Sequence, residues 1–371
     1  MNVLSLFDGM SCGQIALDKL GIKVDNYFAS EIDKYAIQVT QKNYPSTIQI
    51  GSIVDVRGEN LPKIDLLYGG SPCQSFSRAG DGSGFDGKSK LFWHFVRVLR
   101  EVNPKYFLLE NVIMKKEWEQ VITDALGVEP VKICSSKFSA QKRQRLYWTN
   151  IPFESNIIDR GVNLNDIIKG DRVEIINCTL VLDTLSDGSI KIKNATKKGF
   201  LIAKDGDSVN LEVVSSKTRR GRVGIGKTNT LNTACNYGMI KCGKLVKLNI
   251  NDFEALQTVP KDYTSSVSDN QRKKMLGNGW TVDVIAHIFK KLKTIQMKVK
   301  DLVCDSKFLE CVDELATQIT EIKFGADTYT ESSDGVIRFT EEAQDYYNDK
   351  FDEYETLINE RLNVWNIQRE L

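Results

Sequence analysis

Within the first 150 residues, short apolar runs alternate with amphipathic stretches, and this alternation is the strongest constraint on the fold. Parallel strands need crossover connections, which helices usually supply. The order therefore predicts an α/β fold with a doubly wound, mostly parallel, Rossmann-like sheet. The expected strands are 3–7, 26–31, 64–70, 106–112 and 145–151, and the expected helices are 14–20, 33–43 and 91–102.

The rest of the 371-residue chain changes character twice. Short β-rich runs fill 152–245, where Asp187-Gly188 and Asp205-Gly206 are typical of hairpin turns. Helical periodicity returns afterwards. We expect 1–151 and 246–299 to form the α/β body, 152–245 a smaller β-rich domain, and 300–371 an acidic helical extension.

The net charge of +1 conceals a charge asymmetry. Residues 300–371 contain 7 Lys and Arg against 18 Asp and Glu, which leaves a net charge of +12 on the remaining chain. A basic body with an acidic appendage favours a polyanion-binding protein, although solvated surface charge explains it equally well. The acidic segment suggests an additional partner of unknown kind.

Several classes of protein do not fit this sequence. It has no apolar run of 18 residues and no basic stretch before its first apolar run, which argues against a membrane span and a secretory signal. Two histidines, and eight cysteines without a CxxC pair, argue against a metal site and a disulfide framework. We therefore expect a cytoplasmic protein without bound metal.

A turn at the end of the first expected strand is the first candidate binding element. Asp8, Gly9 and Gly13 lie between this strand and the following helix, and Glu31 ends the second strand about 20 residues later. A glycine-containing turn exposes backbone N–H groups, and such a carboxylate binds ribose hydroxyls. The pattern favours an adenosine-bearing cofactor, with an ordinary β–α turn as the alternative.

Three further motifs follow later strands. Cys73 comes after the apolar run 64–68, where a thiol of lowered pKa serves as a nucleophile and a buried structural cysteine is the alternative. Glu110 ends the expected strand 106–112 and is a candidate acid or a plain helix cap. Gln141, Arg143 and Arg145 share one strand face, as a site for an anion or base, or as an exposed basic strand.

Six blocks of sequence together resemble one family. They are DGMSCG, SEIDKYA, GGSPCQSFS, ENV, QKRQRLYW and LGNGWTVDVIAHI. Their order resembles that of the S-adenosylmethionine-dependent DNA cytosine-C5 methyltransferases of bacteria and phages. The resemblance covers residues 1–151 and 246–292.

The resemblance implies a role for each matching residue. Cys73 is the nucleophile that adds to C6 of a flipped-out cytosine, Glu110 protonates N3, and Arg145 with Gln141 and Arg143 steadies the base and the Cys73 loop. S-adenosylmethionine is the implied cofactor, and S-adenosylhomocysteine is the product. The implied cofactor-binding residues are Phe7, Gly9, Met10, Glu31, Ile32, Ser52, Ile53, Gly70, Pro72, Leu91, Asn278 and Trp280.

The resemblance also implies duplex DNA as the partner, bound by a monomer, with 152–245 as the target recognition domain. A restriction-modification setting follows from the same family. The implied DNA-contacting residues are Gln74, Ser75, Arg219, Arg220, Arg222, Lys227 and Thr230.

The sequence departs from the family pattern near the expected cofactor. Ser11 stands at the second turn glycine, Ser52 stands where an Asp contacts adenine, with Asp55 as a substitute, and Gly279 replaces a serine. Two other functions therefore stay open beside DNA methylation. They are the same chemistry on tRNA, and a non-enzymatic DNA-binding relative.

Overall fold

The computed structural model describes residues 1–72, 90–168 and 174–303, and parts of the following segment: 313, 316–317, 320–321, 323–324, 329–331 and 337–364. Cys73, Gln74 and Ser75 lie outside the described residues. The chain contacts divide into two compact units, Asn2–Lys291 and Leu292–Leu371, with Met1 assigned to the second. Each unit is described by itself below.

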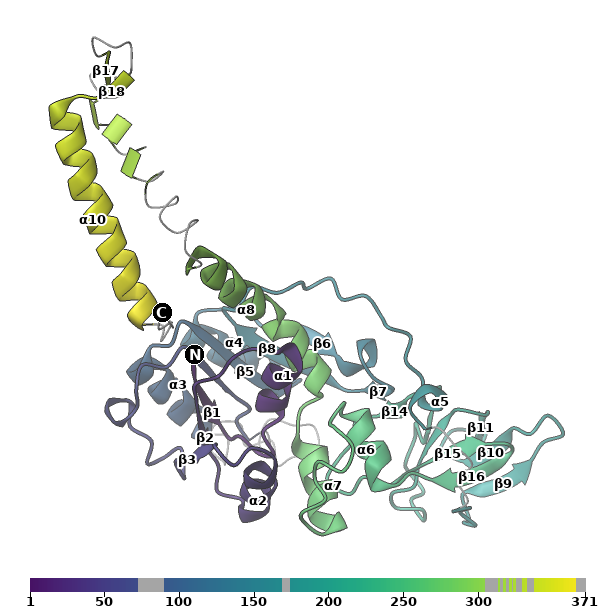
Figure 1. Ribbon diagram of the computed structural model, residues 1–371. Helices are drawn as coiled ribbons and strands as arrows, with labels where there is room; N and C mark the ends of the chain where they lie inside the picture. The colour runs from purple at the N-terminus through teal and green to yellow at the C-terminus, as the bar shows by residue number, and fades with distance from the viewer. Residues whose placement is uncertain are drawn as a thin grey trace. The chain divides into compact units, whose positions relative to one another are not determined.

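A seven-stranded sheet forms the centre of the first unit (Figure 1). Its order is β3 (Ile48–Gln49), β2 (Asn26–Ser30), β1 (Asn2–Leu6), β4 (Leu66–Gly69), β5 (Tyr106–Val112), β8 (Gln144–Thr149) and β6 (Val131–Cys134). The first five strands pair in parallel, whereas β8 runs antiparallel to both β5 and β6. The prediction of a mostly parallel sheet is confirmed.

Helices cover both faces of this sheet. On one face, α3 (Leu91–Val102) and α4 (Lys116–Leu126) bury Phe92, Phe95 and Ile122 against Leu4 and Leu67. On the other face, the Tyr68 ring of β4 lies against Gly13 of α1 (Cys12–Leu20). The same ring lies 5.5 Å from that of Phe289, in the part of α8 (Val282–Val303) that belongs to this unit. Leu67 and Tyr68 are neighbours in β4, so they point to opposite faces of the sheet. The fold is doubly wound, as the alternating pattern predicts.

Most of the predicted elements are present, with small shifts in their bounds. The expected helix 91–102 and strand 106–112 coincide with α3 and β5. The apolar positions of α3 recur at helical spacing, and its last turn ends at Asn103, which adopts a left-handed φ of 39°. Helix α2 (Lys34–Asn43) is likewise expected, and its N-cap Asp33 accepts a hydrogen bond from Tyr35 N.

Three elements of the body were not predicted. Strand β3 is only two residues long, β6 is a partly exposed edge strand, and α4 carries charged residues over most of its length. In each case the apolar pattern is too short or too dilute to indicate an element, because pairing or packing with distant residues supplies the stability.

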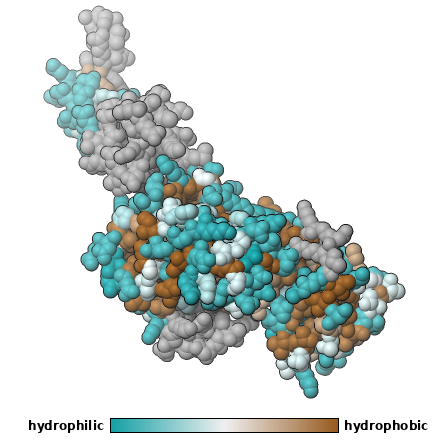
Figure 2. All heavy atoms as spheres, turned by 60° about the horizontal axis from the view of Figure 1, so that its bottom comes forward, coloured by the Kyte–Doolittle hydropathy of each residue, from teal (hydrophilic) through white to brown (hydrophobic). Residues whose placement is uncertain are grey.

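The insert between β8 and α6 (Ile250–Leu256) contains two small sheets. One is formed by β11 (Phe200–Ala203), β10 (Ile190–Lys193) and β9 (Val181–Thr184), and the other by β13 (Val223–Gly224), β12 (Ser208–Asn210), β15 (Tyr237–Lys241) and β16 (Lys244–Lys247). Figure 2 shows apolar side chains gathered on one face of the insert, and its exposed residues include Leu182, Ile202 and Ile225.

Of the two predicted hairpin turns in the insert, one is confirmed. Asp187-Gly188 joins β9 and β10, which pair antiparallel. The prediction for Asp205-Gly206 is wrong, because β11 and β12 belong to different sheets. Gly206 N donates to Ile240 O at 2.8 Å, and the Asp207 carboxylate accepts from Lys204 N at 2.8 Å and from Gly226 N at 2.9 Å. These bonds turn the chain out of one sheet and into the next.

A short parallel ladder joins the insert to the body. Strand β14 (Thr228–Asn229) pairs with β7 (Gln141–Lys142). Beside it, Lys227 Nζ donates to Ser136 O at 2.7 Å. Hydrogen bonds between residues almost 90 positions apart therefore fix the insert at the strand that carries the predicted Gln–Arg–Arg face.

The long helical pattern 269–293 is interrupted in the structure. Helix α7 (Asp269–Asn278) ends at Gly279, and α8 begins at Val282. The interruption places Trp280 on a short connection between two helices instead of within one.

The second unit contains more than the expected helices. Helix α10 (Glu341–Val364) is accompanied by a hairpin of β17 (Tyr329–Glu331) and β18 (Ile337–Phe339). Ala316, Thr320 and Ala343 are buried, and the rings of Phe324 and Tyr346 lie 5.7 Å apart. Among the described residues, no helix combines the length and apolar character needed to cross a membrane.

Gly13 provides a test of the packing between α1 and the sheet. Alanine normally stabilises a helix relative to glycine by about 1 kcal/mol. A Cβ at position 13, however, would lie 2.4 Å from the Tyr68 ring. We expect Gly13→Ala to lower the free energy of unfolding by about 1–3 kcal/mol, measured by chemical denaturation. A variant as stable as the wild type would contradict this packing.

Candidate active site

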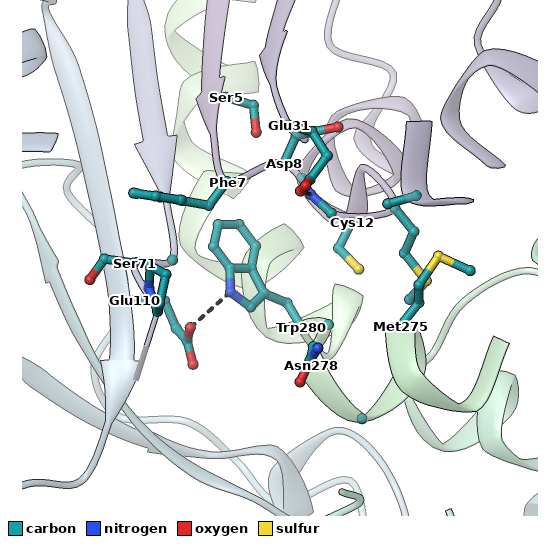
Figure 3. A pocket seen from close by; sticks show the side chains of 18 of the residues that line it. Ser5, Phe7, Asp8, Cys12, Glu31, Ser71, Glu110, Met275, Asn278 and Trp280 are labelled. Carbon is teal, nitrogen blue, oxygen red and sulfur yellow. Dashed lines mark hydrogen bonds between the residues drawn. The ribbon is translucent and has the colours of Figure 1, made fainter. Parts of the chain in front are cut away.

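The main pocket of the first unit lies where β1, β4 and β5 end. It has a volume of about 360 Å³, within the range of small-molecule sites. Ligands of open α/β sheets bind at this carboxyl edge of the strands. Figure 3 shows the indole of Trp280 between Glu110 and the turn that carries Phe7 and Asp8.

The turn from β1 into α1 is held in a left-handed conformation. Phe7, Gly9 and Ser11 have φ values of 57°, 59° and 58°. Ser11 thus occupies the conformation that the expected family glycine adopts without strain. Its hydroxyl donates to the Asp8 carboxylate and lies 3.1 Å from Thr40 Oγ1. These bonds offset the cost of the strained backbone.

Glu31 fixes the same turn from the neighbouring strand. Its Oε2 accepts a hydrogen bond from Gly9 N at 2.7 Å, and its Oε1 accepts from Ile32 N at 2.7 Å and Asp33 N at 2.8 Å. Glu31 also lines the pocket. Each carboxylate oxygen has two lone pairs, so Glu31 has acceptor capacity left for ligand hydroxyls.

Asp8 is a half-buried acid whose role the sequence did not indicate. Tyr27 Oη donates to Asp8 Oδ1 at 2.7 Å, and the hydroxyls of Tyr27 and Tyr68 lie 2.6 Å apart. Burial raises the pKa of Asp8 to about 6, against the lowering effect of its hydroxyl donors. Burial also raises the pKa of both tyrosines, which keeps them neutral donors.

The raised pKa of Asp8 makes stability depend on pH. The pKa of about 6 in the folded protein exceeds the ordinary value of 3.8 for an aspartate, so between these pH values the folded state binds more protons. Stability from this group therefore increases as the pH falls. Between pH 8 and pH 5, the free energy of unfolding should rise by about 1.4 kcal/mol more in the wild type than in Asp8→Asn.

Denaturant titrations of both proteins at the two pH values measure this difference. Equal pH dependence of wild type and Asp8→Asn would exclude the titration of Asp8 in this range.

Glu110 lies at the pocket end of β5 between two donors. Trp280 Nε1 donates to Glu110 Oε2 at 2.9 Å, and Arg145 Nε lies 2.9 Å from Glu110 Oε1. The second contact is an ion pair without hydrogen-bond geometry, so among the described residues the buried Oε1 has no hydrogen-bond donor. A buried acceptor in this state favours a ligand that brings an N–H group.

Gln141 and Arg143 are placed differently from the expectation. The predicted alternation of residues between the two strand faces is correct, since Lys142 and Gln144 are exposed whereas Gln141 and Arg143 are buried. Gln141, however, is fully buried outside the pocket lining, where its Nε2 donates to Gln257 Oε1 at 3.0 Å and its Oε1 accepts from Leu231 N at 2.9 Å. The structure gives Gln141 an anchoring role between the body and the insert.

Arg143 lines the pocket, but its guanidinium is committed to backbone oxygens. It donates to Leu231 O at 3.2 Å, Gly277 O at 3.1 Å and Gly279 O at 2.9 Å. Arg143 is therefore a positioning residue in this structure. It holds the end of α7 and the insert in place.

The structure brings most of the predicted cofactor residues together. The pocket lining includes Phe7, Gly9, Met10, Glu31, Gly70, Pro72, Asn278 and Trp280. It does not include Ser52, Ile53 or Leu91, and Ile53 is instead buried in the core under α3. Ile32 also lies outside the lining, but its 76% exposed side chain stands beside Glu31.

Sequence reasoning missed several lining residues. They include Ser5, Cys12, Tyr68, Ser71, Asn111 and Met275. Burial raises the pKa of the Cys12 thiol to about 12, so this pocket cysteine is protonated near neutral pH. Asn111 Nδ2 donates to Ser71 Oγ at 3.0 Å, which fixes the strand end from which the Cys73 segment departs. Of these residues, Asn111 could have been identified from the sequence, because it is the asparagine of the ENV block.

The insert residues proposed to contact DNA fall into two groups. Arg222 is 1% exposed and donates to the carbonyls of Asn210, Glu212 and Val213, so the expectation of a DNA contact is corrected to a structural role. Lys227 is similarly engaged by Ser136 O. In the second group, Arg219 pairs with Glu212 but is partly exposed, and Arg220 is exposed. Thr230 is also partly exposed, and its Oγ1 donates to Lys142 O of the body at 2.8 Å.

Two neighbouring arginines allow a matched test of this division. Arg222→Ala leaves buried carbonyls unpaired and should lower the free energy of unfolding by about 3 kcal/mol. Arg220→Ala should change stability by less than about 0.5 kcal/mol. Denaturation curves measure both, and equal effects of the two substitutions would contradict the assignment.

Comparisons with known proteins identify the family. The sequence profile of the C-5 cytosine-specific DNA methylases matches residues 1–294. The chain belongs to this family. The match covers the α/β body and the insert, in agreement with the blocks that first indicated it.

The most similar relatives come from phages and bacteria. The orphan methyltransferase M.SPRI of Bacillus phage SPR is 41% identical over 115 residues, which cover 30% of this chain and 26% of the relative. The chain therefore spans about a quarter of that relative's length. The type II methyltransferase M.NgoBI of Neisseria gonorrhoeae is 28% identical over 301 residues, covering 76% of this chain and 90% of the relative.

A solved structure supports the fold. A DNA modification methyltransferase encoded within an E. coli prophage matches with a TM-score of 0.56 and 19% identity, covering 79% of this chain and 99% of that protein. Among the described residues, no group of three or more His, Cys, Asp or Glu side chains is arranged to hold a metal ion.

Proposed function

We propose that the protein transfers a methyl group from S-adenosylmethionine to C5 of cytosine in duplex DNA. The proposal rests on the contacts of the Glu110 carboxylate, together with the membership of the chain in this family. Its carboxylate is buried at the pocket, and one oxygen is held by Trp280. The other oxygen forms an ion pair with Arg145 and has no hydrogen-bond donor among the described residues. A cytosine brought to this oxygen supplies the missing donor through its N4 amino group or a protonated N3.

The pocket fits an adenosine-bearing sulfonium compound. Phe7 and Trp280 offer aromatic faces, and Glu31 offers acceptor oxygens for ribose hydroxyls. Gly70 lies close against the indole, since a Cβ there would meet Trp280 Nε1 at 3.0 Å. When bound, S-adenosylmethionine supplies an electrophilic methyl group on sulfur.

The chain's own residues supply the activation of the base. C5 of cytosine is a poor nucleophile, so the Cys73 thiolate adds to C6 while Glu110 gives a proton to N3. The resulting C5 carbon is electron-rich enough to accept a methyl group, with S-adenosylhomocysteine as the by-product. Transfer of the C5 proton to a solvent base then expels the Cys73 thiolate and restores the C5–C6 double bond, and the N3 proton returns to Glu110.

Burial of Glu110 requires the base to leave the duplex. Glu110 is 7% exposed, and a stacked cytosine presents neither N3 nor C6 to such a site. The proposed reaction therefore includes base flipping. The net charge of +12 outside residues 300–371 and the exposed Arg220 favour binding of the phosphate backbone by the body and insert.

Methyl transfer from labelled S-adenosylmethionine tests the proposal. We expect label at C5 of cytosine within a short duplex motif, mapped base by base, and none in tRNA assayed in parallel. Label only in tRNA would replace the DNA substrate with an RNA substrate. A folded protein that binds DNA without label in either would overturn the enzymatic function.

Two variants test the named residues. Cys73→Ser should abolish transfer while DNA binding persists, and Glu110→Gln should lower kcat by at least about 100-fold. Glu117→Gln, on the exposed side of α4, is the matched control and should retain normal kcat. Normal turnover in Glu110→Gln would remove Glu110 from the mechanism.

A further inference from the structure

We propose that Trp280 is a positioning residue for Glu110, in addition to forming a wall of the pocket. Its indole N–H holds one carboxylate oxygen so that the other faces the base. The inference rests on the proposed function, because it concerns how the acid of that reaction is oriented. It adds a role to a residue that the sequence assigned only to cofactor binding.

The contact between the two side chains is direct and enclosed. Trp280 Nε1 donates to Glu110 Oε2 at 2.9 Å (Figure 3). A Cβ at Gly70 would lie 3.0 Å from this nitrogen and 3.1 Å from the same carboxylate oxygen. The end of β4 therefore approaches the hydrogen bond closely, and a side chain at position 70 would require Trp280 or Glu110 to shift.

The residues on either side of Trp280 are fixed independently. Gly279 O accepts hydrogen bonds from Arg143 Nη2 at 2.9 Å and Gln257 Nε2 at 3.1 Å. On the other side, Thr281 Oγ1 donates to Gln257 Oε1 at 2.8 Å. The short connection between α7 and α8 is thus held at both ends, which limits the positions that the indole can reach.

The ring itself is packed against the sheet. The Trp280 and Tyr68 rings lie 5.9 Å apart with tilted planes, a favourable arrangement for aromatic side chains. Tyr68 is 1% exposed and is hydrogen-bonded through its hydroxyl to Tyr27. The indole is therefore supported by the buried network that also contains Asp8.

An indole nitrogen can only donate, so it specifies an acceptor oxygen on Glu110. With Oε2 held by Trp280, rotation of the carboxylate is restricted, and Oε1 remains beside Arg145, with no hydrogen-bond donor among the residues that the structure describes. Loss of the indole N–H should therefore change the orientation of the acid.

Trp280→Phe removes the donor and keeps an aromatic ring in the pocket. We expect kcat to fall about tenfold, the effect of losing one hydrogen bond to a charged group, with a smaller change in the KM for S-adenosylmethionine. Trp118→Phe on α4, outside the pocket lining, is the matched control and should behave as wild type.

A spectroscopic measurement reports on the contact without requiring turnover. The chain has five tryptophans, so indole ¹⁵N labelling gives five N–H signals, and Trp280→Phe identifies the one from Trp280. Glu110→Gln should move this signal, because the acceptor of the indole N–H changes from a carboxylate to an amide. The Trp118 signal should stay unchanged.

The possible outcomes separate the two proposals. If Glu110→Gln leaves the Trp280 signal unchanged, the positioning role is wrong even if methyl transfer occurs. A rise in KM for S-adenosylmethionine alone, with kcat unaltered in Trp280→Phe, also overturns it. If the signal moves in Glu110→Gln but the wild type transfers no methyl group, the proposed function fails while the contact stands.

Discussion

The buried guanidinium of Arg143 is the interaction on which the rest of the site depends. It donates to Leu231 O in the insert and to Gly277 O and Gly279 O at the end of α7, so one side chain joins its own segment to two others that lie 88 to 136 residues further along the chain. Carbonyls at a helix end have no partners within the helix and need such donors. The close approach of Gly277 to the Asn232 backbone leaves no room for a side chain there. These contacts fix the connection that carries Trp280.

The neighbouring turn after β1 is held by a second buried network. Three consecutive odd-numbered residues, Phe7, Gly9 and Ser11, adopt left-handed φ values, and Asp8 and Glu31 stabilise the turn with side-chain and backbone hydrogen bonds. Strained backbone of this kind persists only where its surroundings determine it fully. The turn and the Trp280 connection meet across the pocket, so the pocket wall is formed by two segments with little freedom to move.

Sequence patterns predicted the body of the fold well and the insert less well. Strands buried on both faces are continuous apolar runs, so β1, β4 and β5 were expected close to their observed positions. The turn at Asp205-Gly206 was misinterpreted because its composition is the same whether the next strand pairs with the last one or enters another sheet. Only the bonds from Asp207 and to Ile240 O make that distinction.

By itself the sequence determined the doubly wound α/β order, the family, and the candidate residues Glu110, Arg145, Glu31 and Phe7, because strand ends and short motifs are local features. The tertiary structure alone decided which polar side chains are available to a ligand. Arg222 and Gln141 have the same chemistry as a DNA or base contact, yet their donors are satisfied by backbone and side-chain partners distant in sequence. It also decided that Trp280 reaches Glu110, since a hydrogen bond across 170 residues exists only after the sheet and α7 have packed.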